Sequence, residues 1–228
     1  MKQALPDAEA VLAEIPLFAG LPADTLAAIA RRMHAHTACR GERLIRQGDP
    51  GDTLLIVLEG HLKVVLLAAS GREIVLDFPG PGAVVGEIAI LDGGPRTASV
   101  VAVEDSRLLL LHRRDLLAGL RAHPDAAIAL LEATARRLRE TDALIEGDRS
   151  LPMASRLARA LLRLARSDGD RLRARLSQGE LGAFAGLSRE NVNRQLKEWE
   201  AEGLVRLESG RMVILDREAL AAMADWME

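Results

Sequence analysis

The 228 residues carry 30 Lys and Arg against 33 Asp and Glu, so the formal net charge is −3, and 49% of the residues are hydrophobic. This composition is typical of a globular protein with one or two domains. It argues against a membrane-spanning segment, because no apolar run approaches the roughly 20 residues that such a helix needs. Residues 1–10 lack the basic and then apolar pattern of a secretory leader. We therefore expect a cytoplasmic protein without a membrane partner.

The chain has a single cysteine, Cys39. One thiol cannot form an internal disulfide, and it cannot alone hold an iron–sulfur cluster, which usually takes four thiolates. Free cysteine packs as a small apolar residue, so we expect Cys39 to be buried.

Short β-type runs follow one another between residues 42 and 112, after a predicted helix at 22–33. The helix is indicated by the apolar spacing of Leu26 and Ile29. Glycine-rich turns separate the β-type runs, which are 44–45, 54–58, 62–67, 74–78, 99–103 and 108–111. Strands at this spacing predict a β-roll, a barrel or a sandwich.

A helix with a narrow apolar seam is predicted from Pro124 to about Gly147. The seam residues step alternately by three and four positions and are Ile128, Leu131, Ala135, Leu138, Asp142 and Ile145. This spacing is typical of a helix that pairs with another helix, and a second copy of the chain is the simplest partner. We expect a homodimer through residues 124–147, followed by a hinge at 148–152.

The last part of the chain is predicted to be compact and basic. Between residues 156 and 197 there are ten Lys or Arg and four Asp or Glu, a local charge of +6, which leaves −9 for the remainder. A basic segment on an acidic chain is typical of a DNA-binding element. The predicted elements are helices at 157–165, 178–185, 189–200 and 218–226 and strands at 204–207 and 212–215.

Residues 178–200 have the spacing of a helix-turn-helix. With Gln178 counted as the first position, Gly182 is fifth, Gly186 is ninth and Val192 is fifteenth. A small fifth residue lets two helices cross closely, and the ninth commonly needs a left-handed backbone. The fifteenth residue is expected to face the core.

The second helix of this motif is the candidate recognition helix, and Ser188 is placed to cap it. Arg189, Glu190 and Arg194 lie in its first turns, where a recognition helix meets base edges in the major groove. Arginine bonds guanine bidentately, and glutamate accepts a hydrogen bond from cytosine. The predicted phosphate contacts are Ser177, Lys197 and Arg211. An exposed helix with ordinary charge pairs is the alternative interpretation.

Residues 85–98 form the candidate ligand site. Gly86 lets the backbone approach a ligand, Glu87 can accept from a ribose hydroxyl, and Arg96 offers its planar fork to a phosphate. Thr97 adds a hydroxyl and a main-chain N–H beside Arg96. A buried ion pair between Glu87 and Arg96, without any ligand, is the alternative.

Two motifs carry a resemblance to the Crp/Fnr family of bacterial regulators. Gly86-Glu87…Arg96-Thr97-Ala98 looks like the phosphate-binding cassette of cyclic-nucleotide-binding domains, and 188–194 looks like the recognition-helix signature of the family. The resemblance extends from residue 17 to the C-terminal hairpin. It implies an α+β fold with an N-terminal jelly-roll-like β-roll at 1–123, a long dimerisation helix at 124–147 and a winged helix-turn-helix at 152–228.

The resemblance also implies roles for the site residues. Glu87 would bind the ribose 2′-hydroxyl, and Arg96 with Thr97 would bind the cyclic phosphate. The further ligand residues that it implies are Gly86, Ile88, Ala98, Arg137, Thr141 and Asp142. Thr141 matches the helix residue that contacts the purine in cAMP-binding members. The recognition helix would read TGTGA-like half-sites of a palindromic operator, with RNA polymerase as a further partner.

Two departures from the cAMP-responsive members concern the purine. Those members have a serine, donated by the partner subunit, where this chain has Asp142, and the Arg-Thr-Ala that begins at Arg96 is that of cGMP-dependent protein kinases. Guanine presents two neighbouring donors that one carboxylate accepts together, whereas adenine presents one amino group. cGMP and cAMP are therefore both candidate ligands. A polar seam residue that sets the helix register is the alternative for Asp142.

Other interpretations stay open at this point. His34-Ala35-His36 and Glu42 partly match the metal motif of cupin enzymes, but with the wrong gap, so we expect no metal and no enzymatic activity. A regulator of the same family could respond instead to haem, redox state or cyclic di-GMP, or could bind DNA without a ligand. We expect His61 to be a strand-surface residue rather than a haem ligand.

Overall fold

A computed structural model describes residues 8–15, 18, 22–68, 73–125, 151–168, 170–172, 176–208 and 210–224, together with 127, 128, 131, 132, 134, 135, 138 and 139. The contacts divide the chain into two compact units, one within 1–62 and 79–141 and the other within 63–78 and 142–228. The predicted domain boundaries after residue 123 and before residue 152 stay predictions.

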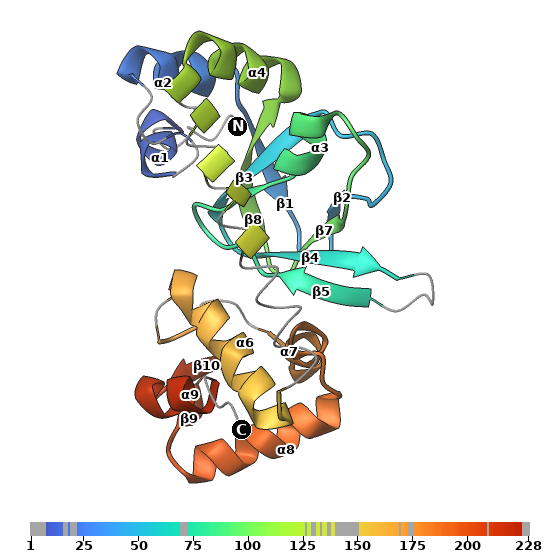
Figure 1. Cartoon of the computed structure of the whole chain (residues 1–228), viewed down its shortest axis with the longest axis vertical. Coiled ribbons are helices and arrows are strands. Elements are labelled where there is room, and N and C mark those ends of the chain that lie inside the picture. The colour runs from blue at the N-terminus through green and yellow to red at the C-terminus, as the bar shows by residue number, and fades with distance from the viewer. Residues whose placement is uncertain are drawn as a thin grey trace. The chain divides into compact units, whose positions relative to one another are not determined.

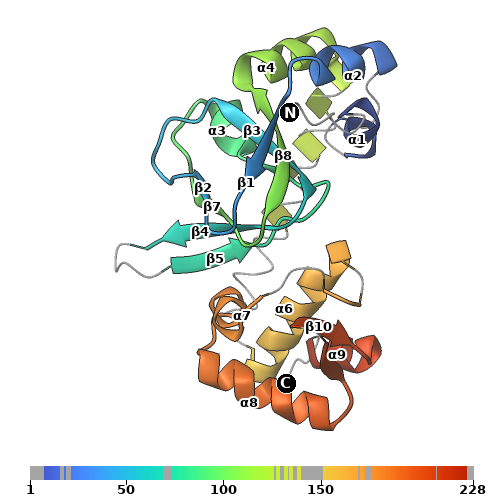
Figure 2. The same cartoon turned by 180° about the vertical axis from the view of Figure 1, so that it is seen from behind.

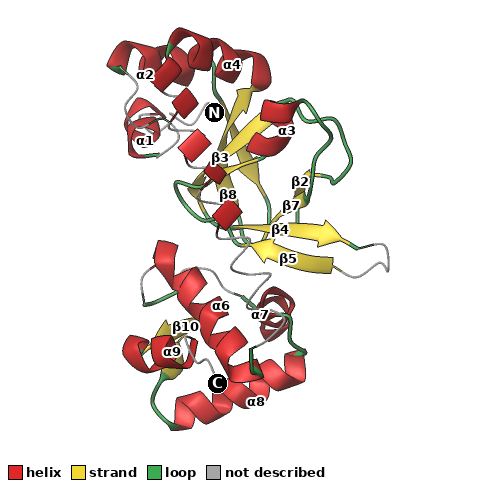
Figure 3. Cartoon of the chain, in the orientation of Figure 1, coloured by secondary structure: helices red, strands yellow, loops and turns green. Residues whose placement is uncertain are grey.

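Two four-stranded sheets make up the N-terminal β-roll, and this confirms the predicted fold class (Figure 3). The first sheet has the order β1-β8-β3-β6, which are His34–Ala38, Ser106–His112, Thr53–Glu59 and Val84–Val85. The second has the order β2-β7-β4-β5, which are Arg43–Ile45, Ser99–Ala102, Leu62–Leu67 and Glu73–Asp77. The long strands β3 and β8 pair antiparallel from Thr53 opposite His112 to Glu59 opposite Arg107.

Side chains from β3 and β8 build the core of the β-roll. Leu54 and Ile56 of β3 and Leu109 and Leu111 of β8 are fully buried. The helices α1 (Ala8–Glu14), α2 (Ala23–Ala30) and α4 (Arg113–Ala122) add Leu12, Leu26, Ile29 and Leu116 to the same cluster. In both views α2 and α4 lie side by side at one end of the β-roll (Figures 1 and 2). Burial of a large apolar side chain contributes about 1.5–3 kcal/mol to the stability of the fold. This cluster therefore stabilises the β-roll that carries the candidate ligand site.

The C-terminal unit contains the predicted winged helix-turn-helix. Its helices are α6 (Met153–Asp168), α7 (Gln178–Ala185), α8 (Arg189–Ala201) and α9 (Arg217–Ala224), and its hairpin is β9 (Val205–Glu208) with β10 (Arg211–Ile214). α6 packs against both α7 and α9. Leu157 and Leu161 of α6 and Trp199 of α8 are buried to 2% exposure or less. The antiparallel hairpin follows α8 directly, as a wing does.

Several elements were not predicted by the sequence patterns. They are α1, β1, β6, α3 (Glu87–Asp92) and α4. β1 pairs only with β8 and lies at the edge of its sheet, so it needs no alternating apolar residues. The described residues between 124 and 139 are helical, in agreement with the predicted seam helix.

Two predictions about single side chains are wrong. Cys39 is exposed, because it follows β1 in a turn where its N–H donates to Oε2 of Glu42 over 3.1 Å. His61 is not a surface residue: only 4% of it is exposed, and its Nδ1 lies 2.6 Å from Oε1 of Glu104. A polar partner therefore allows the histidine to be buried where the strand pattern suggested exposure.

Candidate ligand site and nucleic-acid interface

The candidate ligand site is built around the start of α3. Gly86 precedes this helix with a left-handed backbone (φ +90°), and Glu87 is the first helical residue. A Cβ built on Gly86 would lie 2.6 Å from Nη1 of Arg96, so only glycine fits at this position. Ala89 and Ile90 anchor α3 in the core, whereas Ile88 is 42% exposed.

Arg96 is buried and is held by main-chain atoms. Only 7% of the residue is exposed. Its Nη1 donates to the carbonyl oxygen of Gly86 over 3.0 Å and its Nη2 to that of Thr53 over 2.6 Å. Its own N–H donates to the carbonyl of Asp49, and its carbonyl accepts from the N–H of Gly48, both over 2.8 Å. The guanidinium therefore has a fixed position beside the N-terminus of α3.

The charge of Arg96 is opposed by burial. Burial lowers the pKa of the Arg96 guanidinium below its ordinary value, while the nearby carboxylates of Asp52 and Glu87 raise this pKa. In the described part of the chain no carboxylate lies within salt-bridge distance of Arg96, although the charges of Asp52 and Glu87 still act on it, so the alternative of an ion pair with Glu87 stays open. A buried cation whose bonds go to neutral carbonyls is suited to bind an anion.

The structure brings the residues of the predicted cassette together. Gly86, Glu87 and Ile88 lie at the start of α3, and Arg96, Thr97 and Ala98 lie in the segment that leads into β7. Thr97 is exposed next to the buried guanidinium. Arg137, Thr141 and Asp142 lie outside the described residues.

Sequence reasoning missed Gly51 as a member of this site. A Cβ built on Gly51 would lie 2.5 Å from Cβ of Ala89 and 2.9 Å from Nε of Arg96. The turn at residues 48–51 is therefore fitted against the guanidinium and α3 together. Its glycine and proline content signals only a turn, and the close approach to Arg96 depends on residues more than 40 positions later.

Neither a metal site nor a membrane span emerges from the described residues. Within them, no group of three or more His, Cys, Asp and Glu side chains is placed to hold a metal ion. None of their helices is both long enough and apolar enough to cross a bilayer.

The helix-turn-helix owes its geometry to two glycines. α7 begins with a capping box in which Oγ of Ser177 accepts from the N–H of Glu180, and Oε2 of Glu180 accepts from the N–H of Ser177. α7 ends at Gly186, whose backbone is left-handed (φ +66°). A Cβ built on Gly182 would lie 2.7 Å from the carbonyl oxygen of Leu187, so a larger residue would push against the turn.

The candidate recognition helix α8 exposes the predicted side chains. Oγ of Ser188 caps it by accepting from the N–H of Asn191 over 3.2 Å, and Val192 is fully buried. The predicted DNA-facing residues of α8 are all exposed: Arg189, Glu190, Arg194 and Lys197. Arg211 lies on β10 and is half-buried, and Ser177 is exposed.

Comparison with known proteins assigns both the N-terminal and the C-terminal part of the chain to families. The model of the cyclic nucleotide-binding domain matches residues 35–123, and the model of the Crp-like helix-turn-helix domain matches residues 155–223. The first range contains the Gly86–Arg96 cradle, and the second contains α7, α8 and the hairpin.

Relatives cover nearly the whole chain. It is 33% identical over 220 residues to the CRP-like cAMP-activated global transcriptional regulator of Mycobacterium tuberculosis, covering 94% of this chain and 98% of that protein. It is 38% identical over 213 residues to the cyclic AMP receptor protein of Thermus thermophilus, covering 92% and 96%. The structure of FixK2 from Bradyrhizobium japonicum, 22% identical, shares the fold with a TM-score of 0.78 and covers 86% of this chain and 99% of that one. The chain therefore belongs to the Crp/Fnr family of transcription regulators, which joins a cyclic nucleotide-binding domain to a Crp-like helix-turn-helix.

Proposed function

We propose that this regulator binds a cyclic nucleotide monophosphate at the Gly86–Arg96 cradle and responds by changing its affinity for DNA. The observation that carries the proposal is the buried guanidinium of Arg96, fixed by the carbonyls of Gly86 and Thr53 and unpaired with any carboxylate of the described chain. In this arrangement Arg96 and the hydroxyl of Thr97 would bind the cyclic phosphate. Glu87 would accept from the ribose 2′-hydroxyl.

The purine is proposed to be adenine or guanine. Two relatives are named for cAMP, which favours adenine. The carboxylate of Asp142 favours guanine, since it would accept from N1–H and N2–H₂ together. Thr141 and Arg137 would complete the purine contacts from the same helix. Together with Gly86, Ile88 and Ala98, these residues form the proposed ligand site.

A homodimer through residues 124–147 is proposed from the seam of this helix. Ile128, Leu131 and Leu138 are 54%, 69% and 61% exposed in the single chain. Three large apolar side chains at this spacing favour a second helix as their partner. Asp142 would face its own copy, where two carboxylates disfavour each other's charged form. A purine bound there would relieve this repulsion and shift the arrangement of the two helices and of the DNA-binding heads.

The DNA contacts are proposed to divide into two kinds. Arg189, Glu190 and Arg194 would read base edges of TGTGA-like half-sites in the major groove. Ser177, Lys197 and Arg211 would contact phosphates, and Ser188 would cap the recognition helix. We further propose that the protein is cytoplasmic, has no enzymatic activity and contacts RNA polymerase at a promoter.

Calorimetric titration of the full chain with cAMP, cGMP and cyclic di-GMP tests the ligand. We expect one of the two mononucleotides to bind at one site per chain, and Arg96→Gln to weaken this binding at least tenfold. Arg107→Gln is the matched control, because Arg107 bonds Glu59 on the surface, at the end of the β3–β8 pair opposite to Thr53. Tight binding of cyclic di-GMP alone, or full affinity in Arg96→Gln, would overturn the proposed site. Operator binding is then measured by fluorescence anisotropy with and without the nucleotide that binds.

A further inference from the structure

A cavity of about 390 Å³ lies inside the C-terminal unit, apart from the cradle in the β-roll. It is partly open to solvent and is lined by residues of α6, α7, α8 and the β9–β10 hairpin. Most of its wall is apolar: Leu161, Leu164, Leu172, Leu176, Leu181, Leu196, Val205, Leu207 and Met212. Since a cavity of about 150 Å³ already accepts benzene, this one has room for an aromatic ring with a short chain and a head group.

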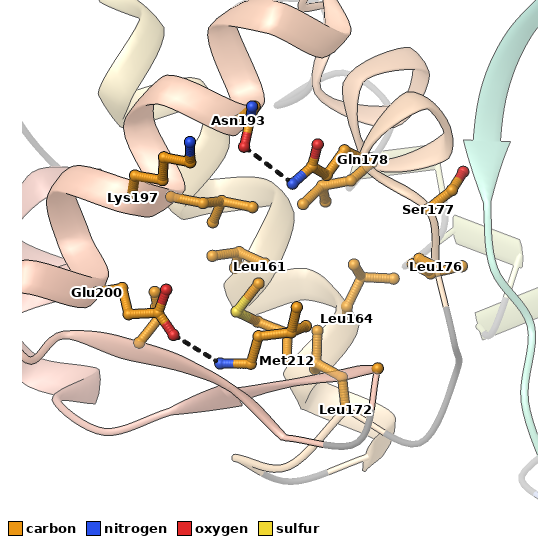
Figure 4. Close-up of a pocket in the computed structure, with 15 residues that line it drawn as sticks. Leu161, Leu164, Leu172, Leu176, Ser177, Gln178, Asn193, Lys197, Glu200 and Met212 are labelled. Atoms are coloured by element: carbon orange, nitrogen blue, oxygen red, sulfur yellow. Dashed lines mark hydrogen bonds between the residues drawn. The ribbon is translucent and has the colours of Figure 1, made fainter.

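Three of the polar residues of the cavity lie along one side of it. Figure 4 shows Gln178, Asn193 and Lys197 along the edge opposite Leu164 and Met212. Nε2 of Gln178 donates to Oδ1 of Asn193 over 3.1 Å, so these two amides share one hydrogen bond.

The acidic lining residue is also engaged. Oε1 of Glu200 accepts from the main-chain N–H of Leu207 over 3.3 Å, which ties α8 to the hairpin. The hydroxyl of Ser177 is engaged with Glu180 in the capping box. These contacts leave the ammonium of Lys197, which has no hydrogen-bond or ion-pair partner among the described residues. Lys197 is thus the charged lining residue without a described partner, and it is a cation.

From this pairing of an apolar chamber with one uncommitted cation, we propose that the cavity binds a small amphiphilic carboxylate. The apolar body would occupy the leucine-lined chamber, and the carboxylate would lie at the ammonium of Lys197. A cationic ligand would be repelled by the ammonium of Lys197. A ligand with a polar body would lose its hydration against the apolar wall.

Because Lys197 lies on α8, such a ligand would affect the proposed DNA interface. Asn193 and Lys197 are four residues apart and share the flank of the helix that lines the cavity. Lys197 is also one turn after Arg194, on the side that carries the exposed recognition residues. A carboxylate held at Lys197 would compete with a DNA phosphate for the same ammonium.

The test is calorimetric titration of the full chain with 4-phenylbutyrate, in the absence of DNA and of any nucleotide. We expect saturable binding with a Kd of roughly 1 mM or tighter. 4-Phenyl-1-butanol, which has the same body without the charge, should bind about tenfold more weakly, and butyrate should not bind measurably. Because neither DNA nor nucleotide is present, this result is independent of the proposed function.

Two pairs of variants locate the binding. Lys197→Gln should weaken the binding of phenylbutyrate about tenfold but leave the affinity for the alcohol unchanged. Arg194→Gln, on the same helix and outside the lining, should change neither affinity. Leu207→Trp should block the cavity, while Leu215→Trp should not; Leu207 is 57% and Leu215 46% exposed, so both tolerate a larger side chain. Absence of saturable binding, or an affinity that neither Lys197→Gln nor Leu207→Trp changes, would overturn the proposal.

Discussion

The main-chain carbonyl of Gly86 accepts a 3.0 Å hydrogen bond from Nη1 of Arg96, and no side chain fits between the two residues. The glycine that precedes α3 and the cation that would bind the phosphate therefore fix each other's positions. Any change at one of them should be felt both as a change of stability and as a change of ligand affinity.

Gly86→Ala should reduce nucleotide affinity more than Gly82→Ala does. Both glycines have a left-handed backbone, with φ of +90° and +83°, so both variants should lose about 1 kcal/mol through backbone strain. Among the described residues, the new methyl group would meet no atom within 4 Å at Gly82, whereas at Gly86 it would lie 2.6 Å from Nη1 of Arg96, 3.2 Å from Cδ1 of Ile45 and 3.3 Å from the carbonyl oxygen of Thr53. We expect Gly86→Ala alone to lose at least tenfold in nucleotide affinity. Urea unfolding and calorimetry measure both effects, and equal affinities in the two variants would contradict this account.

Gly182→Ala should damage the helix-turn-helix, whereas Gly179→Ala should not. The new Cβ at Gly182 would lie 2.7 Å from the carbonyl oxygen of Leu187, a main-chain atom that moves only if the turn moves. We expect a loss of about 1–3 kcal/mol in unfolding free energy, as for other overpacked sites. At Gly179 the nearest atom is Oγ of Ser177 at 3.9 Å, so alanine should be neutral or stabilising by up to about 1 kcal/mol. Urea denaturation of the two variants decides the point.

Arg194 and Lys197 should affect DNA binding in different ways. Arg194→Ala removes a proposed base contact, so it should cost about 1–3 kcal/mol on the operator and relax the preference at one base pair. Lys197→Ala removes a proposed phosphate contact, so it should weaken all sequences alike and reduce the slope of log K against log salt by about 1. Binding to operator and scrambled duplexes over a range of salt concentrations separates these outcomes. A uniform loss in Arg194→Ala would show that its role was misassigned.

Leu131→Glu should convert the proposed dimer into a monomer. Leu131 is 69% exposed in the single chain, and its place in the seam would bring two carboxylates into an apolar helix interface. Leu215→Glu is the control, because Leu215 is 46% exposed and lies outside the seam. Sedimentation velocity at micromolar concentration should show a monomer for the first variant and a dimer for the second. If Leu131→Glu sediments as the unaltered protein does, the helix is not the dimer interface.

Glu42 should titrate abnormally in the folded protein. Its hydrogen bonds with the side chain of His36 and with the N–H of Cys39 lower the pKa of the Glu42 carboxyl below 4.5. Since the folded pKa is lower than the unfolded one, the stabilisation from Glu42 is present above pH 4.5 and is lost as the pH falls through the folded pKa. His36→Ala should move the pKa back toward its ordinary value. An NMR titration of the carboxyl carbon measures the shift in both proteins.

Elements whose signals are local could be predicted from the amino-acid sequence. β4 (Leu62–Leu67) and α7 (Gln178–Ala185) were predicted with the same bounds, because a bounded apolar run and a capped helix depend on neighbouring residues. α8 and the β9–β10 hairpin were predicted to within one or two residues. The cassette and the recognition helix were found because their motifs are contiguous or nearly so.

The environment of individual side chains depends instead on contacts that form when the chain folds. His61 is buried because Glu104, 43 residues later, lies against its ring, and Cys39 is exposed because the turn after β1 points it outward. Short or edge elements such as α3 and β1 were missed, since they depend on Gly86 and on pairing with β8 rather than on a periodic pattern.

The same division holds for the two binding sites. The sequence indicated Arg96 and Gly86, but the partner carbonyl of Thr53 at the start of β3 and the close fit of Gly51 in the turn before it depend on how the chain packs around Arg96. The C-terminal cavity has no sequence signature at all, because its leucines follow the ordinary apolar pattern of core residues. The apolar periodicity of a sequence predicts which side chains face the core. The space left between these side chains depends on how the helices and the hairpin pack in the folded chain.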